Sequence, residues 1–152
     1  GMHHYARCLA YLAKNDRAAA QAEYALFQKT TDAEAVKVVE NPYFPAGKVV
    51  EVANEILLGK LALHQGDEKN ALQHLGQAVA IEDEIPYMEP PFWYYSAKWS
   101  LGAAQVLTGN YVEAEATFRK DLEWLPRNGW ALHGLAAALR NQGKTQAADS
   151  VY

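Results

Sequence analysis

The chain has 152 residues, half of them hydrophobic and 21% charged, with a formal net charge of -4. That length fits one domain, residues 1–152, with a continuous core. No apolar run reaches the roughly 18–20 residues that span a bilayer. Lysines and arginines are scattered among acids, which excludes a typical nucleic-acid-binding surface. We therefore expect neither a membrane nor a nucleic acid as a partner.

Hydrophobic periodicity predicts helices along nearly the whole chain and no strand. The first pair is expected at about 3–14 and 17–29. A capping box at Thr31–Glu34 starts a short helix that ends near Glu40, where Pro42 follows. Further helices are expected at about 48–64, 68–81, 91–108, 111–124, 128–142 and 144–152. The sequence therefore predicts an all-α fold.

Three sets of side chains recur at fixed offsets from four turn residues. The turn residues are Asn15, Gly66, Gly109 and Gly143. Seven positions earlier the side chains are small: Cys8, Gly59, Gly102 and Ala136. Five positions later stands an alanine, and nine positions later a large apolar residue: Tyr24, Leu75, Phe118 or Tyr152. Helix-sized blocks that repeat in this way indicate stacked helical hairpins.

The physical basis of the pattern is close helix packing. Small side chains let two helices cross closely, and the large residue fills the adjoining space. Glycine and asparagine tolerate the left-handed conformation that ends a helix. The expected caps of the helices that follow are Asp16, Asp67, Asn110 and Thr145. Asn110 with Glu113 also has the form of a capping box.

These residues and offsets resemble the tetratricopeptide repeat, a helix-turn-helix unit of about 34 residues. The resemblance implies a right-handed α-solenoid of about four hairpins, at about 2–30, 48–82, 91–126 and 128–152, with insertions after the first and second. It also implies a non-catalytic scaffold that binds a protein or peptide on its concave face, without a cofactor.

The segment Glu89–Tyr95, with the sequence EPPFWYY, resembles a narrower bacterial group of longer repeat proteins. In that group the segment belongs to the C-terminal part, which leaves open that this chain is a piece of a longer protein. The group has a proline after the paired tyrosines and an arginine two positions later. Here Ser96 and Lys98 stand instead, so the resemblance implies no anion contact at these positions.

The first helix of each hairpin lines the concave face in the family that the chain resembles. With the aromatic residues of the second insertion, this implies nine peptide-binding residues: Tyr5, Lys60, His64, Trp93, Tyr94, Trp99, Trp130, His133 and Arg140. Rings mixed with cations suit a peptide with an apolar anchor and an acidic group or free carboxylate. The alternative is that Trp99 and Trp130 only pack between neighbouring helices.

The first insertion, at about 31–47, has two interpretations. It is either an extra helix and spacer between the first two hairpins, or a loop that reaches over the groove. In the second case Tyr43 and Phe44 would be the contacts.

The second insertion, at about 83–91, carries three prolines and leads into four aromatic residues, Phe92–Tyr95. Prolines hold the segment extended, and the rings supply a large contact area. The rings either plug the gap left by the long linker, or Trp93 and Tyr94 edge a peptide pocket. Four consecutive aromatic residues on one helical turn cannot all face inward, so at least one should be exposed.

No set of residues assembles a catalytic or metal site, so we expect a chain that is not an enzyme. Cys8 occupies a small-residue crossing position, where burial explains it better than nucleophilic chemistry. The five histidines lack the i,i+3 or i,i+4 spacing of a helical metal site. A single cysteine and the absence of a signal-peptide pattern favour a reducing, cytoplasmic compartment.

The last predicted helix ends on the large position, Tyr152, and leaves an apolar strip with nothing after it. Three explanations remain open. Tyr152 folds back onto Leu135 and Leu139, a second copy docks there, or the natural chain continues. The alternative function is therefore a structural or self-assembly module that forms a homo-oligomer through its terminal helical faces.

Overall fold

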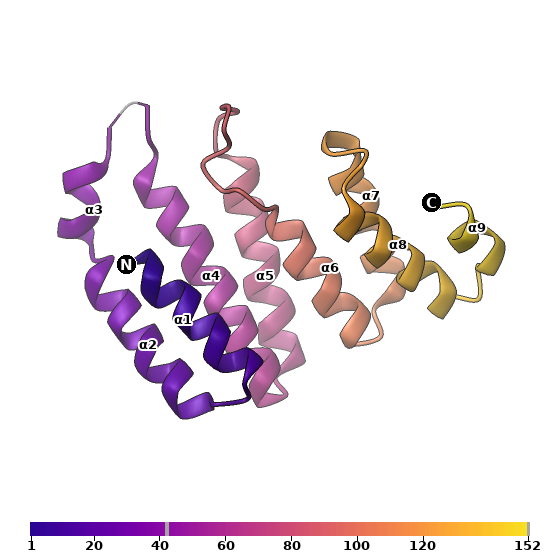
Figure 1. Cartoon of the computed structure of the whole chain (residues 1–152), viewed down its shortest axis with the longest axis horizontal. Helices are drawn as coiled ribbons and strands as arrows, with labels where there is room; N and C mark the ends of the chain where they lie inside the picture. The colour runs from indigo at the N-terminus through magenta and orange to yellow at the C-terminus, as the bar shows by residue number, and fades with distance from the viewer. Residues whose placement is uncertain (42, 152) are drawn as a thin grey trace. The chain divides into compact units, whose positions relative to one another are not determined.

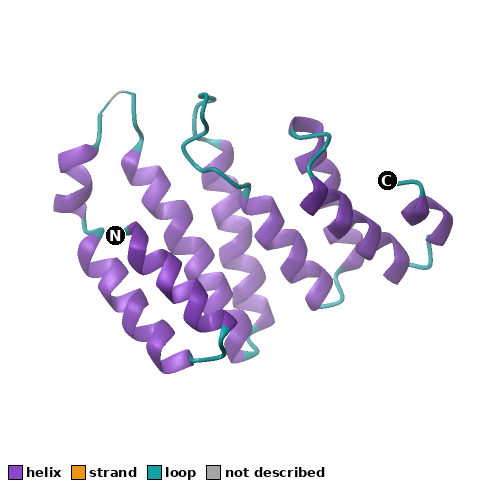
Figure 2. Ribbon diagram, viewed as in Figure 1, coloured by secondary structure: helices purple, strands orange, loops and turns teal. Residues whose placement is uncertain are grey.

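The computed structural model describes residues 1–41 and 43–151, and within these it contains nine helices and no strand (Figures 1 and 2). The helices are α1 (Met2–Ala13), α2 (Arg17–Thr30), α3 (Ala33–Val39), α4 (Ala46–Gln65), α5 (Glu68–Asp83), α6 (Ala97–Leu107), α7 (Tyr111–Trp124), α8 (Gly129–Asn141) and α9 (Thr145–Asp149). The predicted all-α fold is confirmed. The helix stop assigned to Pro42 lies outside the described residues.

Contacts divide the chain into two compact units, where the sequence predicted one domain. Unit 1 is Gly1–Tyr94 and unit 2 is Tyr95–Tyr152. In unit 1, α1 pairs with α2 and α4 with α5, while α1, α2 and α3 all pack on α4. In unit 2, α6 pairs with α7 and α8 with α9, and α8 also packs on α6 and α7. Each unit is thus built from helical hairpins.

The four turn residues adopt the predicted left-handed backbone. Their φ angles are 59° at Asn15, 80° at Gly66, 79° at Gly109 and 76° at Gly143. Asparagine and glycine are the residues that adopt this conformation most readily, so the turn positions of the repeat follow from backbone sterics.

The predicted helix caps are only partly correct. The carboxylates of Asp16 and Asp67 each accept a cap hydrogen bond at 3.1 Å. Asn110 stands at the cap position of α7, but its side chain makes no cap hydrogen bond, and its amide group donates to the Thr108 hydroxyl. The other two predictions fail by one residue: Asp32 caps α3 where Thr31 was expected, and α9 already includes Thr145.

The pairing of small and large residues is confirmed in the second and third hairpins, whereas Tyr152, the large residue of the fourth, lies outside the described residues. A β-carbon at Gly59 would lie 2.6 Å from Leu75 Cγ, and one at Gly102 would lie 2.5 Å from Phe118 Cζ. A second glycine, Gly134 on α8, leaves even less room, since its β-carbon would lie 2.2 Å from the same Phe118 atom. The Phe118 ring therefore fills a space that two glycines on different helices create.

The second insertion folds back onto unit 1. The expected helix from about residue 91 begins only at Ala97, where Ser96 provides the cap, so the four aromatic residues do not share a helical turn. The Trp93 ring packs edge-on against Tyr5 with 5.5 Å between ring centroids, and is 7% exposed. Tyr94 is 81% exposed, which confirms that one of the four rings stays outside the core.

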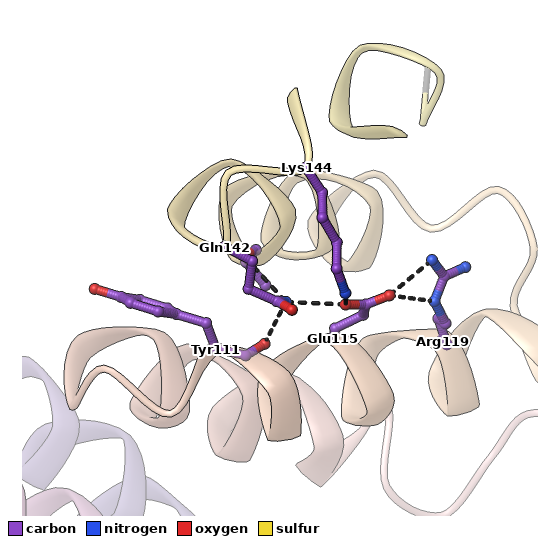
Figure 3. Close-up of polar contacts among 6 residues, drawn as sticks. Tyr111, Glu115, Arg119, Gln142 and Lys144 are labelled. Atoms are coloured by element: carbon purple, nitrogen blue, oxygen red, sulfur yellow. Dashed lines mark hydrogen bonds and ion pairs between the residues drawn. The ribbon is translucent and has the colours of Figure 1, made fainter. Parts of the chain in front are cut away.

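A cluster of polar side chains fastens α7 to the turn between α8 and α9 (Figure 3). One carboxylate oxygen of Glu115 accepts from Lys144 Nζ at 2.7 Å and from Gln142 Nε2 at 2.9 Å, and the other accepts from Arg119 Nη2 at 2.9 Å. The Gln142 amide also donates to the Tyr111 carbonyl at 3.0 Å. The hydrogen bond from Lys144, followed by those from Arg119 and Gln142, holds the pKa of Glu115 at about 2.

We expect Glu115→Gln to lower the free energy of unfolding by about 1 kcal/mol at neutral pH, because the charged hydrogen bonds are lost. Since the folded-state pKa is depressed, the contribution is complete above the ordinary value near 4.5 and is lost as pH falls towards about 2. Urea unfolding at several pH values measures this. Glu113→Gln, an exposed change on the same helix, is the control, and equal pH slopes in the two variants would contradict the prediction.

Candidate functional site

An open hollow of about 540 Å³ lies in unit 2, beside the start of α6, the end of α7 and the loop that leads to α8. Its lining residues are Trp99, Trp124, Leu125, Pro126, Arg127 and Asn128. We call it the tryptophan hollow. Its walls are mainly apolar, and it is large enough for a bulky side chain of a partner.

The tryptophan hollow is organised by one buried carboxylate. Asp121 on α7 is 2% exposed, and its Oδ2 accepts from Trp99 Nε1 at 2.8 Å and from Asn128 Nδ2 at 2.8 Å. The Asn128 side-chain oxygen in turn accepts from the Trp130 backbone N–H at 3.1 Å, which caps α8. Asp121 thus fixes one tryptophan wall and the loop wall, and connects three helices.

The hollow combines an apolar wall with a charged side chain at its rim. Trp124 is 74% exposed and Leu125 is 49% exposed, so a large apolar surface faces solvent. Arg127 at the rim is also exposed and has no ion-pair partner within residues 1–41 and 43–151. An apolar wall beside an available guanidinium suits a ligand that combines an apolar side chain with a carboxylate.

Three predicted binding residues lie along one face of α8. Trp130, His133 and Arg140 are all exposed, and their spacing places them on the same side of the helix. The Trp130 side chain is 74% exposed, so the alternative that it only packs between helices is wrong. The Arg140 guanidinium lies 3.2 Å from Asp149 on α9.

The comparisons with known proteins give one family match. Residues 96–120, which include α6 and part of α7, match the tetratricopeptide repeat. No curated protein and no solved structure matches the chain significantly. Tetratricopeptide repeats generally mediate protein–protein interactions and are generally not catalytic.

The predicted binding residues of unit 1 differ in how far they are exposed to solvent. Tyr5 and Trp93 pack against each other and are only 6% and 7% exposed, so the expectation that they contact a peptide is corrected: both belong to the core. Lys60 and His64 lie one turn apart on α4 and are half-buried, and burial lowers the pKa of the Lys60 amine. Tyr94 is exposed. A binding role for these last three residues stays a prediction.

The surroundings of Cys8, His4 and His74 in unit 1 indicate that these titratable side chains serve the fold. Cys8 is fully buried, and burial, followed by the nearby Glu23 charge, raises the pKa of its thiol to about 11, which disfavours the reactive thiolate. His4 Nδ1 lies 2.7 Å from a Glu23 carboxylate oxygen across the first hairpin, and His74 Nδ1 lies 2.7 Å from a Glu55 carboxylate oxygen across the second.

The part of the chain that the structure describes contains neither a candidate metal site nor a candidate membrane span. Within residues 1–41 and 43–151, no group of three His, Cys, Asp or Glu residues could hold a metal ion. None of the helices in this part of the chain combines the length and the apolar character needed to cross a bilayer. The self-association surface was predicted to end at Tyr152, which lies outside the described residues, so the assembly function stays a prediction.

Sequence reasoning found only one wall of the tryptophan hollow. Trp99 was selected from its position in the repeat, whereas Trp124, Leu125 and Arg127 were not. The available signal was the segment from Trp124 to Arg127, in which two apolar residues, a proline and an arginine follow one another at the end of a helix. Such a run at the end of a helix indicates candidate contacts, because a loop usually exposes it.

Proposed function

We propose that the chain is a non-catalytic scaffold that binds a segment of a protein partner through unit 2. The observation that carries this proposal is the tryptophan hollow, whose Trp124 wall is 74% exposed. Exposed tryptophan that lines a concave apolar site is the residue type most enriched in binding hot spots. The known role of tetratricopeptide repeats in protein–protein interaction supports the same conclusion.

The chemistry of the site supports a ligand with two features. An aromatic or branched aliphatic side chain would contact Trp99 and Trp124, and a neighbouring carboxylate would pair with Arg127. Further residues of the peptide would continue onto the exposed face of α8. That face begins at Trp130, two residues after the Asn128 wall.

Peptides selected from a random library on the intact protein provide the probe for this proposal. For the selected peptides we expect Trp124→Ala to weaken binding at least about tenfold, because an exposed hot-spot tryptophan contributes about 2 kcal/mol or more. Arg127→Gln should weaken only those peptides that carry a carboxylate. Both side chains are exposed, so the melting temperature should stay near that of the wild type.

Val112→Ala is the matched control, since Val112 is an apolar residue of α7 that is 65% exposed and lies outside the hollow. Equal affinity in Trp124→Ala and Val112→Ala would contradict the proposal. A loss of binding in Trp130→Ala or Arg140→Gln alone would move the site to the α8 face.

A further inference from the structure

The two insertions of unit 1 meet each other. The rings of Phe44, from the first insertion, and Phe92, from the second, lie 5.5 Å apart between centroids. Lys48 at the start of α4 forms an ion pair with Glu84 after α5 at 2.8 Å. Figure 1 shows both loops at the same end of the helices of unit 1. The two insertions therefore contact each other at one end of unit 1.

Residues of both insertions that the structure describes are held by specific contacts. In the first, the backbone groups of Asn41 and Phe44 exchange two hydrogen bonds, with N–O distances of 3.3 and 3.0 Å. In the second, Trp93 is buried against Tyr5 of α1. A surface on these segments is thus presented by an anchored backbone, which limits the entropy that binding would cost.

Aromatic side chains remain exposed in and next to these insertions. Tyr43 is 80% exposed, Tyr87 is 78% exposed, and Tyr94 is 81% exposed. Met88 beside Tyr87 is also exposed, and Tyr87, Met88 and Phe92 all line a small hollow of about 140 Å³. Exposed tyrosines on fixed loops provide a large contact area with few rotatable bonds. We call Tyr43, Tyr87, Met88, Glu89 and Tyr94 the tyrosine edge.

The charged side chains in and next to the second insertion are all negative. Residues 82–95 contain four carboxylates and no lysine or arginine. One of the carboxylates, Glu84, is neutralised by Lys48. Another, Glu89, is exposed and accepts a hydrogen bond from the Tyr87 hydroxyl, which raises the pKa of Tyr87. A negative group therefore lies directly beside an exposed aromatic ring.

We propose that the tyrosine edge binds an arginine-containing segment of a protein partner. A guanidinium can stack on a tyrosine face and donate paired hydrogen bonds to the Glu89 carboxylate, so ring and charge act on the same group. Arginine fits better than lysine, because its planar fork stacks on a ring whereas an ammonium does not. This surface belongs to unit 1 and prefers a cation, so it is independent of the tryptophan hollow, which is proposed to take a carboxylate.

Fluorescent peptides of alternating arginine and glycine, lysine and glycine, and glutamate and glycine test this proposal on the full chain. We expect the arginine peptide to bind most tightly and the glutamate peptide not to bind. The double variant Tyr87→Ser/Tyr94→Ser should weaken the arginine peptide about tenfold. Glu89→Gln should weaken it as well.

Two controls separate this site from general attraction to an acidic protein. Glu51→Gln removes the same charge from an exposed position on α4 and should leave affinity unchanged. Trp124→Ala, in the tryptophan hollow, should also have no effect. Equal affinity in Glu89→Gln and Glu51→Gln, or an unchanged affinity in the double tyrosine variant, would overturn the proposal. All the changed side chains are exposed, so each variant should fold, and a circular dichroism melt of each variant checks this.

Discussion

Replacing Gly134 with alanine is expected to lower the free energy of unfolding by about 2–3 kcal/mol, the cost of overpacking a closed core. The added methyl carbon would lie 2.2 Å from Phe118 Cζ and 2.6 Å from both Cε atoms. The ring is 3% exposed and cannot retreat, because a β-carbon at Gly102 would already lie 2.5 Å from it on the other side. Urea unfolding followed by circular dichroism measures the loss.

Gly76→Ala is the matched control for this change. Gly76 lies inside α5, and its β-carbon would meet nothing within 4 Å. Alanine should therefore stabilise the chain there by about 0.5–1 kcal/mol, through helix propensity alone. Adding Phe118→Leu to Gly134→Ala should recover part of the loss. Similar stability in the two single alanine variants would show that the Phe118 ring has room to move.

The comparison of Gly134 with Gly102 shows how far the sequence could predict this core. The small residue at Gly102 recurs at a fixed offset from the turn, because it serves packing within a hairpin, and hairpin geometry repeats along the chain. Gly134 serves the contact of α8 with α7, which is contact between hairpins. It does not stand at the recurring small-residue position, so an offset pattern could not find it.

In the candidate site, too, the sequence predicted what depends on local position in a helix but not what depends on contacts between distant residues. Trp99 was predicted because its position in the repeat is a local property of α6. The placement of Tyr5 and Trp93 was predicted incorrectly, since their contact joins residues far apart in the sequence and depends on an insertion that no repeat pattern describes. The late start of α6 has a local cause that was available: prolines at 90 and 91 and the Ser96 cap both favour a helix that begins after them.

Replacing the buried carboxylate of Asp121 is expected to reduce both the stability of the chain and its binding of peptides. Asp121→Ala should lower the free energy of unfolding by about 2–4 kcal/mol, because the Trp99 indole N–H and the Asn128 amide would both lose their acceptor in a buried place. It should also abolish binding of the peptides selected on the wild type, since two walls of the tryptophan hollow would lose their support. Asp121 is thus a positioning residue.

Two further variants separate positioning from general damage to the fold. Asp121→Asn keeps one acceptor oxygen, so it should retain more stability than Asp121→Ala and recover part of the peptide affinity. Trp99→Phe keeps an aromatic ring but removes the indole donor and part of the ring surface, and combining it with Asp121→Ala should cost less than the sum of the two single changes, because both remove the same hydrogen bond. Tryptophan fluorescence should change in Asp121→Ala as the ring leaves the carboxylate. Additive losses in the double variant, or full peptide binding in Asp121→Ala, would show that the carboxylate does not organise the hollow.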